Sequence, residues 1–91
     1  MDKKQAMKTL QKASDETLRL RTESPSDPLI STDRQLHYLV DALERKNDRT
    51  KLSNMMFWQY AVHEFENIEP AYAELLHKAS AIADLMKSGE L

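Results

Sequence analysis

The sequence predicts an all-α fold, a small antiparallel bundle of about four helices. Good helix formers dominate the 91 residues, while one glycine and three prolines leave little turn-forming material for a β protein. Apolar residues recur at helical spacing in four segments, and short polar or proline-containing stretches separate these segments. Because there is no internal repeat and no long linker, we expect residues 1–91 to form a single helical domain with a thin core.

The first helix is predicted within residues 1–22, from about Lys3 to Arg21. Its buried stripe has spacings of 4, 3, 4 and 3 residues and consists of Ala6, Leu10, Ala13, Thr17 and Leu20. The stretch 23–28 then interrupts the helix, because its two prolines remove backbone donors and push the preceding residues out of the α region.

The second helix is expected to begin at Ser31 or Thr32, with Thr32 and Gln35 as a capping box. Its buried stripe is Leu36, Leu39, Val40 and Leu43. The opposite, polar face consists of Arg34, Tyr38, Asp41 and Arg45, so the Tyr38 side chain is predicted to be exposed to solvent.

The third helix is expected to start from Asp48 as its N-cap and to be apolar on two faces. At 100° per residue, one side collects Leu52, Met55, Trp58 or Val62, and Phe65, which we assign to the core. The other side collects Met56, Tyr60, His63 and Asn67, with Phe57 and Glu64 beside them. Either another helix or a partner must cover this second face.

The fourth helix is predicted to begin at Pro70, a suitable first-turn residue, and to stop at Gly89. Its stripe is Tyr72, Leu75, Leu76, Ala79, Ile82 and Met86.

Charge is distributed unevenly and argues against a nucleic-acid partner. No Lys or Arg occurs between Lys51 and Lys78, and this gap holds four glutamates and five of the six aromatic residues. Nucleic-acid binding needs Lys and Arg to neutralise phosphates, and we interpret the more basic first helix as a solvated face.

No motif in the sequence indicates catalysis or a cofactor, and Glu64, Glu66 and Glu69 are interpreted as a solvated acidic face rather than as acid–base groups. There is no cysteine, no glycine-rich phosphate loop and no nucleophile motif. His63-Glu64 lacks the second histidine of a zinc motif, because Asn67 stands at that position. We therefore expect no metal, no cofactor and no enzyme. No apolar run reaches membrane-spanning length and no secretory signal is visible, so the expected compartment is the cytoplasm, without membrane contact.

These observations predict a protein that binds another protein. The alternative is a self-associating structural or regulatory bundle, in which the second face of the third helix closes a homodimer that is obligate in solution. A weak homodimer beside the protein partner also stays open. For Phe57 and Tyr60 a core position remains an equal alternative, whereas Trp58 and Phe65 are expected in the core.

Three motifs resemble the small helical immunity proteins of bacterial type VI secretion effectors, specifically those that neutralise NAD(P)+ glycohydrolase toxins. They are Ser-x-x-x-Gln-Leu-x-Tyr (Ser31, Gln35, Leu36, Tyr38), Asp-Arg-Thr-x-Leu (Asp48, Arg49, Thr50, Leu52), and Ala-Val-x-Glu-Phe-Glu (Ala61, Val62, Glu64, Phe65, Glu66) leading to Glu69-Pro70. The resemblance covers residues 29–89 without gaps. Residues 56, 57, 58 and 60 are bulkier than the family pattern, and the first helix matches poorly.

The resemblance implies a cytoplasmic inhibitor that binds one cognate secreted toxin and covers the toxin's dinucleotide-binding cleft. Such a cleft holds a pyrophosphate and is expected to be electropositive, so an acidic, aromatic surface would complement it. The predicted partner-binding residues are Met56, Tyr60, His63, Glu64 and Asn67, with Tyr38 and Asp41 as a second patch.

Overall fold

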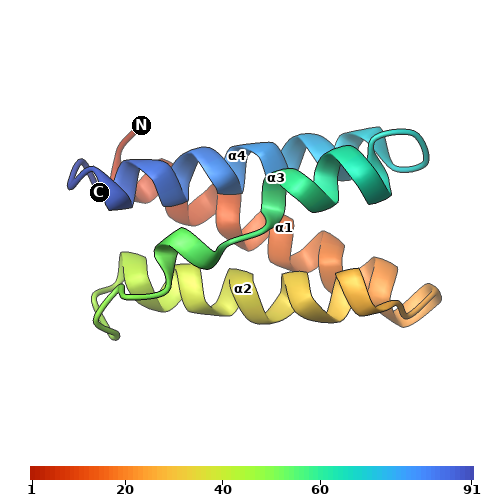
Figure 1. Ribbon diagram of the computed structural model, residues 1–91, viewed down its shortest axis with the longest axis horizontal. Coiled ribbons are helices and arrows are strands. Elements are labelled where there is room, and N and C mark those ends of the chain that lie inside the picture. The colour runs from red at the N-terminus through yellow and green to blue at the C-terminus, as the bar shows by residue number, and fades with distance from the viewer.

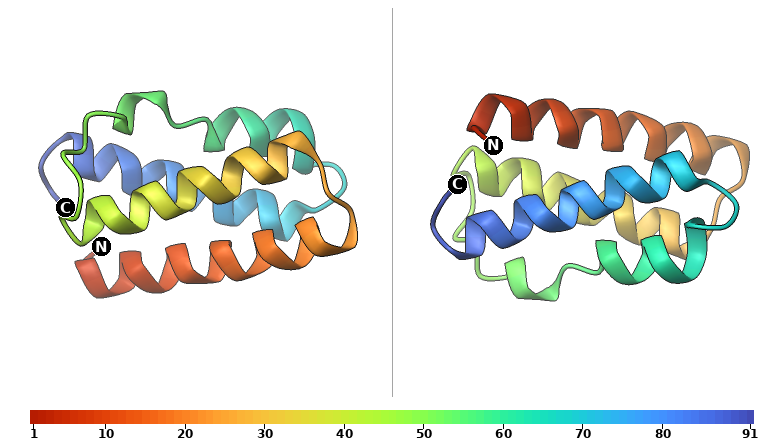
Figure 2. Two further views of the ribbon diagram at one scale, coloured as in Figure 1. Left: turned by 90° about the horizontal axis from the view of Figure 1, so that it is seen from below. Right: turned by 90° about the horizontal axis from the view of Figure 1, so that it is seen from above.

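The computed structural model describes residues 1–91 as four helices that run alternately up and down (Figure 1). They are α1 (Lys3–Glu23), α2 (Asp27–Leu43), α3 (Phe57–Tyr60) and α4 (Pro70–Lys87), and no strand is present. The predicted all-α antiparallel bundle is therefore confirmed. The α1–α2 and α3–α4 connections lie at one end of the bundle, and the chain termini and the 44–51 loop lie at the other (Figure 2).

The stripe predicted for α1 is confirmed, since all five of its residues are buried. Asp2 caps the helix: its carboxylate accepts the Gln5 N–H, and the Gln5 side chain accepts the Asp2 N–H. The helix continues to Glu23, slightly past the predicted end at Arg21, and stops just before the first proline of the connection.

The start predicted for α2 is wrong, because the helix begins at Asp27 rather than at Ser31 or Thr32. The Ser26 hydroxyl caps it by accepting the Leu29 N–H, and Pro28 lies in the first turn. A proline is tolerated there because first-turn N–H groups have no helical partner, so this residue opens a helix instead of breaking one. Thr32 is a fully buried residue of the helix and not its cap.

The end of α2 forms a Schellman motif with an arginine in the position that usually holds glycine. Arg45 has φ 58°, its N–H bonds the Ala42 carbonyl, and the Lys46 N–H bonds the Asp41 carbonyl. The same pair of bonds closes α4 at Gly89, as the sequence predicts, with φ 82°.

The Asp48 cap was expected to start the third helix, and this expectation is wrong. The Asp48 carboxylate accepts the N–H and the hydroxyl of Thr50 inside the 44–51 loop. These bonds, above all the one from the Thr50 N–H, lower the pKa of Asp48. The chain then forms only a short 3-10 turn (Leu52–Asn54) before α3 begins at Phe57.

The α3 helix continues directly into a π-helical turn (Ala61–Phe65), in which the Glu66 N–H bonds the Ala61 carbonyl at 2.8 Å. In an α-helix, residues spaced by four do not lie directly above one another, so a row of them drifts around the helix axis. A π turn holds more residues per turn than an α turn, so it turns this drift back. Phe57, Ala61 and Phe65 consequently all face the core.

This register decides one open alternative for the third helix and corrects one expectation. Phe57 is fully buried, whereas Trp58, which was expected in the core, is 54% exposed. The reason is that 100° per residue, counted from the 48–55 region, does not apply to a segment that is mostly loop and then contains a π turn.

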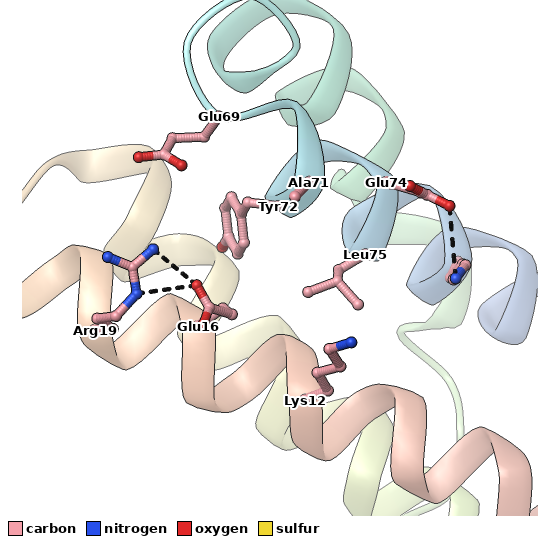
Figure 3. Close-up of a pocket in the computed structure, with 9 residues that line it drawn as sticks. Lys12, Glu16, Arg19, Glu69, Ala71, Tyr72, Glu74 and Leu75 are labelled. Atoms are coloured by element: carbon pink, nitrogen blue, oxygen red, sulfur yellow. Dashed lines mark hydrogen bonds and ion pairs between the residues drawn. The ribbon is translucent and has the colours of Figure 1, made fainter.

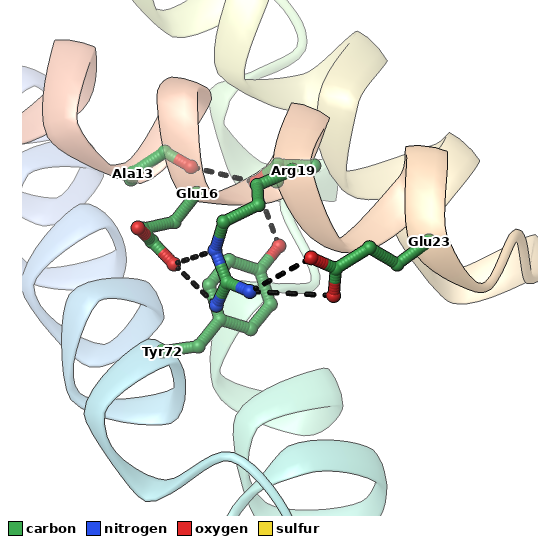
Figure 4. Close-up of polar contacts among 6 residues, drawn as sticks. Ala13, Glu16, Arg19, Glu23 and Tyr72 are labelled. Carbon is green, nitrogen blue, oxygen red and sulfur yellow. Dashed lines mark hydrogen bonds and ion pairs between the residues drawn. The ribbon is translucent and has the colours of Figure 1, made fainter.

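The core lies where α4 packs between α1 and α3. The stripe predicted for α4 is confirmed, because all of its residues are buried. Tyr72 lies at the centre of the core: its ring meets Phe65 edge-on, with centroids 4.9 Å apart, and its hydroxyl lies 2.7 Å from the Thr17 hydroxyl. Thr17 donates to the Ala13 carbonyl, so Tyr72 is the donor in this pair (Figure 4). Burial raises the pKa of Tyr72 to about 12.

Candidate protein-binding surface

The segment 56–68 is buried on one side only, and its outer side exposes large apolar groups to solvent. Met56 is 41% exposed, Trp58 54% and Ile68 73%. Exposed tryptophan is uncommon on surfaces without a partner and is enriched in binding hot spots. The π turn within this segment adds a second indication, because such turns are frequent at functional sites.

Four of the five residues predicted on this face are exposed. Met56, His63, Glu64 and Asn67 all present their side chains to solvent. Tyr60 is only half-buried, and its hydroxyl donates to the Ser31 hydroxyl at 3.1 Å, so it joins this face to α2.

The second predicted patch, Tyr38 and Asp41, lies on α2 toward the 44–51 loop. Asp41 is exposed. Tyr38 does not stand free in water as expected: it is half-buried, and its hydroxyl accepts the Lys51 N–H at 2.9 Å. The chain at Asn67 leads into the α3–α4 connection at the opposite end (Figure 1), so the two patches are not one compact site.

A row of hydrogen bonds, which we call the polar seam, joins α2 to the 51–60 segment. Ser31 accepts from Tyr60, the Gln35 side-chain carbonyl accepts the Met56 N–H at 2.7 Å, and Tyr38 accepts from Lys51. Gln35 also donates to the Ser31 hydroxyl at 2.9 Å. The three α2 residues are spaced by 4 and 3 residues, so they share one side of the helix. They are the polar members of one motif of the family resemblance, which thus has a structural role.

A shallow apolar hollow of about 290 Å³ is lined by residues of the α1–α2 connection and of the segment that leads into α4. Both connections lie at the same end of the bundle (Figure 2). We call it the end hollow. Its lining consists of Leu20, Ser24, Ser26, Pro28, Leu29, Glu64, Phe65, Ile68 and Glu69. Sequence reasoning missed it because two stretches that are far apart in sequence, residues 20–29 and 64–69, build it. The only signal was an isoleucine inside a polar loop.

A second hollow, of about 320 Å³, lies between α1 and α4 over the Tyr72 ring (Figure 3). Its charged groups largely neutralise one another: the Arg19 guanidinium bonds Glu16 at 2.9 Å and reaches Glu23 at 3.3 Å, and Lys78 pairs with Glu74 at 3.6 Å. The hydrogen bond with Glu16 is the main cause that raises the pKa of Arg19 (Figure 4).

The bundle carries opposite charge at its two ends. At the connection end, Asp27, Glu64, Glu66 and Glu69 take part in no ion pair, while Arg19 is held by two glutamates and Arg21 bonds Asp33 at 2.7 Å. At the other end, the first turn of α1, the 44–51 loop and the last turn of α4 contain more cations than acids. The free carboxylates therefore concentrate around the end hollow.

No group of three or more His, Cys, Asp or Glu side chains is placed to hold a metal ion. None of the four helices combines the length and the apolar character needed to cross a bilayer.

Comparisons with known proteins place the chain near one family. The family model described as Tsi6 matches residues 5–85. One chain of the structure of Tse6 in complex with Tsi6 is similar in fold, with a TM-score of 0.84, 24% identity and coverage of 92% of both chains. The structure of Tsi6 from Pseudomonas aeruginosa has a TM-score of 0.79 and 25% identity, and the match covers 86% of this chain and 83% of that one. No curated protein matches the chain.

Proposed function

Because the chain belongs to the Tsi6 family of type VI immunity proteins, we propose that it binds a cognate toxin and inhibits it by covering the toxin's NAD(P)+-binding cleft. The family match spans most of the chain, and the relative in one similar structure is assembled with Tse6. Both observations support a secreted toxin as the partner.

The contact surface that we propose is the outer face of the 56–68 segment. It contains Met56, Tyr60, His63, Glu64 and Asn67, and the structure adds Trp58, while Tyr38 and Asp41 remain a second, peripheral patch. The observation that carries this assignment is the pair Phe57 and Trp58: the first is fully buried and the second is 54% exposed. A large aromatic group beside a rigid buried one is a preorganised anchor for a protein partner.

Electrostatics supports the proposed mode of inhibition. A dinucleotide presents a negatively charged pyrophosphate, so the cleft that binds it is expected to offer N–H donors and cationic side chains. Carboxylates at Glu64, Glu66 and Glu69 have no partner within this chain and can pair with such groups. Steric cover of the cleft needs no chemistry from the inhibitor, so we propose that the protein is not an enzyme and acts in the cytoplasm, where NAD(P)+ is at risk.

The decisive experiment measures cellular NAD(P)+ in bacteria that express the toxin domain encoded beside this gene, with and without this protein. The pool is expected to collapse with the toxin alone and to be preserved when both are present. Trp58→Ala is expected to lose this protection at equal expression. Leu18→Ala, which truncates an exposed apolar residue on α1, is the matched control and should still protect.

If the pool does not fall, the toxin chemistry is wrong; if it falls equally in both cases, the pairing is wrong. Sedimentation then tests the alternative, because an obligate dimer of the purified protein would support a self-associating bundle.

A further inference from the structure

We propose that the end hollow receives an apolar side chain that the toxin presents next to a lysine or arginine, so that the toxin docks over this end of the bundle. The inference rests on the proposed function and assigns an anchor point to it. It adds Ile68 and Glu69 to the contact residues.

The shape and lining of the end hollow fit a side chain better than a small-molecule ligand. At about 290 Å³ it lies at the lower limit of ligand pockets, and it is open to solvent. Leu20, Leu29 and Phe65 are buried and form its floor, while Ile68 stands 73% exposed at its edge. Exposing Ile68 in this way is unfavourable in the free protein, and covering it with an apolar group would recover that free energy.

The floor of the hollow is already formed in the chain on its own, held by packing and by backbone hydrogen bonds. The Phe65 ring packs edge-on against the Tyr72 ring. The Phe65 carbonyl accepts two backbone hydrogen bonds, from Ile68 at 3.1 Å and from Glu69 at 2.7 Å, which hold the 65–69 turn. A side chain entering the hollow therefore meets preformed walls, and little entropy is lost on ordering them.

The charge around the end hollow distinguishes between two occupants, a segment of the toxin and a second copy of this chain. Glu64 and Glu69 line it, and neither forms an ion pair within this chain. Asp27 and Glu66 lie in the adjoining turns and are also free. A cationic segment is attracted to this end, whereas a second copy would bring the same carboxylates against themselves. The toxin segment is thus the favoured occupant.

The test compares the affinity and association rate of the purified toxin domain for four variants of the full chain. Ile68→Ser removes the apolar edge, and Glu69→Lys reverses a lining charge. The matched controls are Leu18→Ser, another exposed leucine-sized residue, and Glu90→Lys, an exposed acid near the opposite end. Circular dichroism and thermal melting establish that each variant is folded.

We expect Ile68→Ser to weaken binding by roughly tenfold or more, mainly through faster dissociation. Glu69→Lys should slow association by roughly tenfold at low salt and reduce its dependence on ionic strength. Both controls should stay within about threefold of the wild-type affinity.

Two outcomes separate the failure of this inference from the failure of the proposed function. If the wild-type chain neither binds nor inhibits the toxin domain, both fall. If the wild type binds while Ile68→Ser and Glu69→Lys bind equally well, the toxin docks elsewhere and only this inference is overturned. A wild-type dimer that Ile68→Ser converts to a monomer would also overturn it, because the occupant would be a second copy.

Discussion

The Tyr38 hydroxyl accepts the backbone N–H of Lys51 at 2.9 Å, which ties the C-terminal half of α2 to the end of the 44–51 loop. Lys51 lies outside any helix, so this N–H has no regular backbone partner. With Gln35 and Ser31, Tyr38 forms the polar seam that holds the irregular 51–60 segment. The seam depends on single hydrogen bonds where other helix pairs rely on apolar packing.

Tyr38→Phe is expected to lower the free energy of unfolding by about 1 kcal/mol, because one hydrogen bond is lost and the ring is kept. Amide hydrogen exchange at Lys51 should accelerate, while exchange within α1 and α4 should follow global stability. Unchanged exchange at Lys51 would contradict the role assigned to the hydroxyl.

Phe57→Ala and Trp58→Ala should separate stability from binding at neighbouring positions. Phe57 is fully buried, so its truncation should cost about 3–5 kcal/mol, measured by urea unfolding. Trp58 is mostly exposed, so its truncation should cost less than about 1 kcal/mol and instead weaken toxin binding. A large loss of stability for Trp58→Ala would mean that the indole belongs to the core.

Arg45→Gly and Arg49→Gly should change stability in opposite directions although both residues have positive φ, 58° and 61°. The Arg45 side chain makes no hydrogen bond or ion pair, so glycine relieves the left-handed conformation and adds about 1 kcal/mol. Arg49 bonds the carbonyls of Ala42 and Leu91, each at 3.0 Å. Losing these charge-assisted bonds should outweigh the relief and lower stability by roughly 1–2 kcal/mol in thermal unfolding.

Tyr72 should make stability fall in strong alkali. The pKa of its folded state is raised from 10.0 to about 12, so the unfolded chain releases the phenolic proton first as pH rises. The contribution is complete below pH 10 and is lost through pH 12, a change of roughly 2–3 kcal/mol. Tyr72→Phe has no phenolic proton to release, so over that pH interval the free energy of unfolding of the wild type should fall relative to that of the variant. A constant difference would indicate that the hydroxyl titrates normally.

Periodicity was sufficient to predict α1 and α4, because each is a regular helix with one buried stripe. Their stripes include Leu10 and Leu76, which are fully buried, and the signals at Pro70 and Gly89 also hold. The helix starts were predicted wrongly where the same residue type can play two structural roles. Pro28 could break a helix or open one, and Asp48 could cap a helix or organise a loop.

The third helical region could not be predicted from periodicity because its backbone is not a regular α-helix. No sequence pattern marks the π turn at Ala61–Phe65, and it changes which neighbour faces inward. The end hollow escaped prediction for another reason: Leu29 and Ile68 are far apart in sequence, and only the packing of the connections brings them together.

The π turn also has a consequence for how the surface of this chain can diversify. Seven α-helical residues make close to two full turns, so deleting one residue between Phe57 and Phe65 would still leave both rings facing the core. Such a deletion would shorten the outward-facing sequence that contains His63 and Glu64 by one position and shift the charges along it. The loss of a single codon would therefore alter partner choice while the interior packing is preserved.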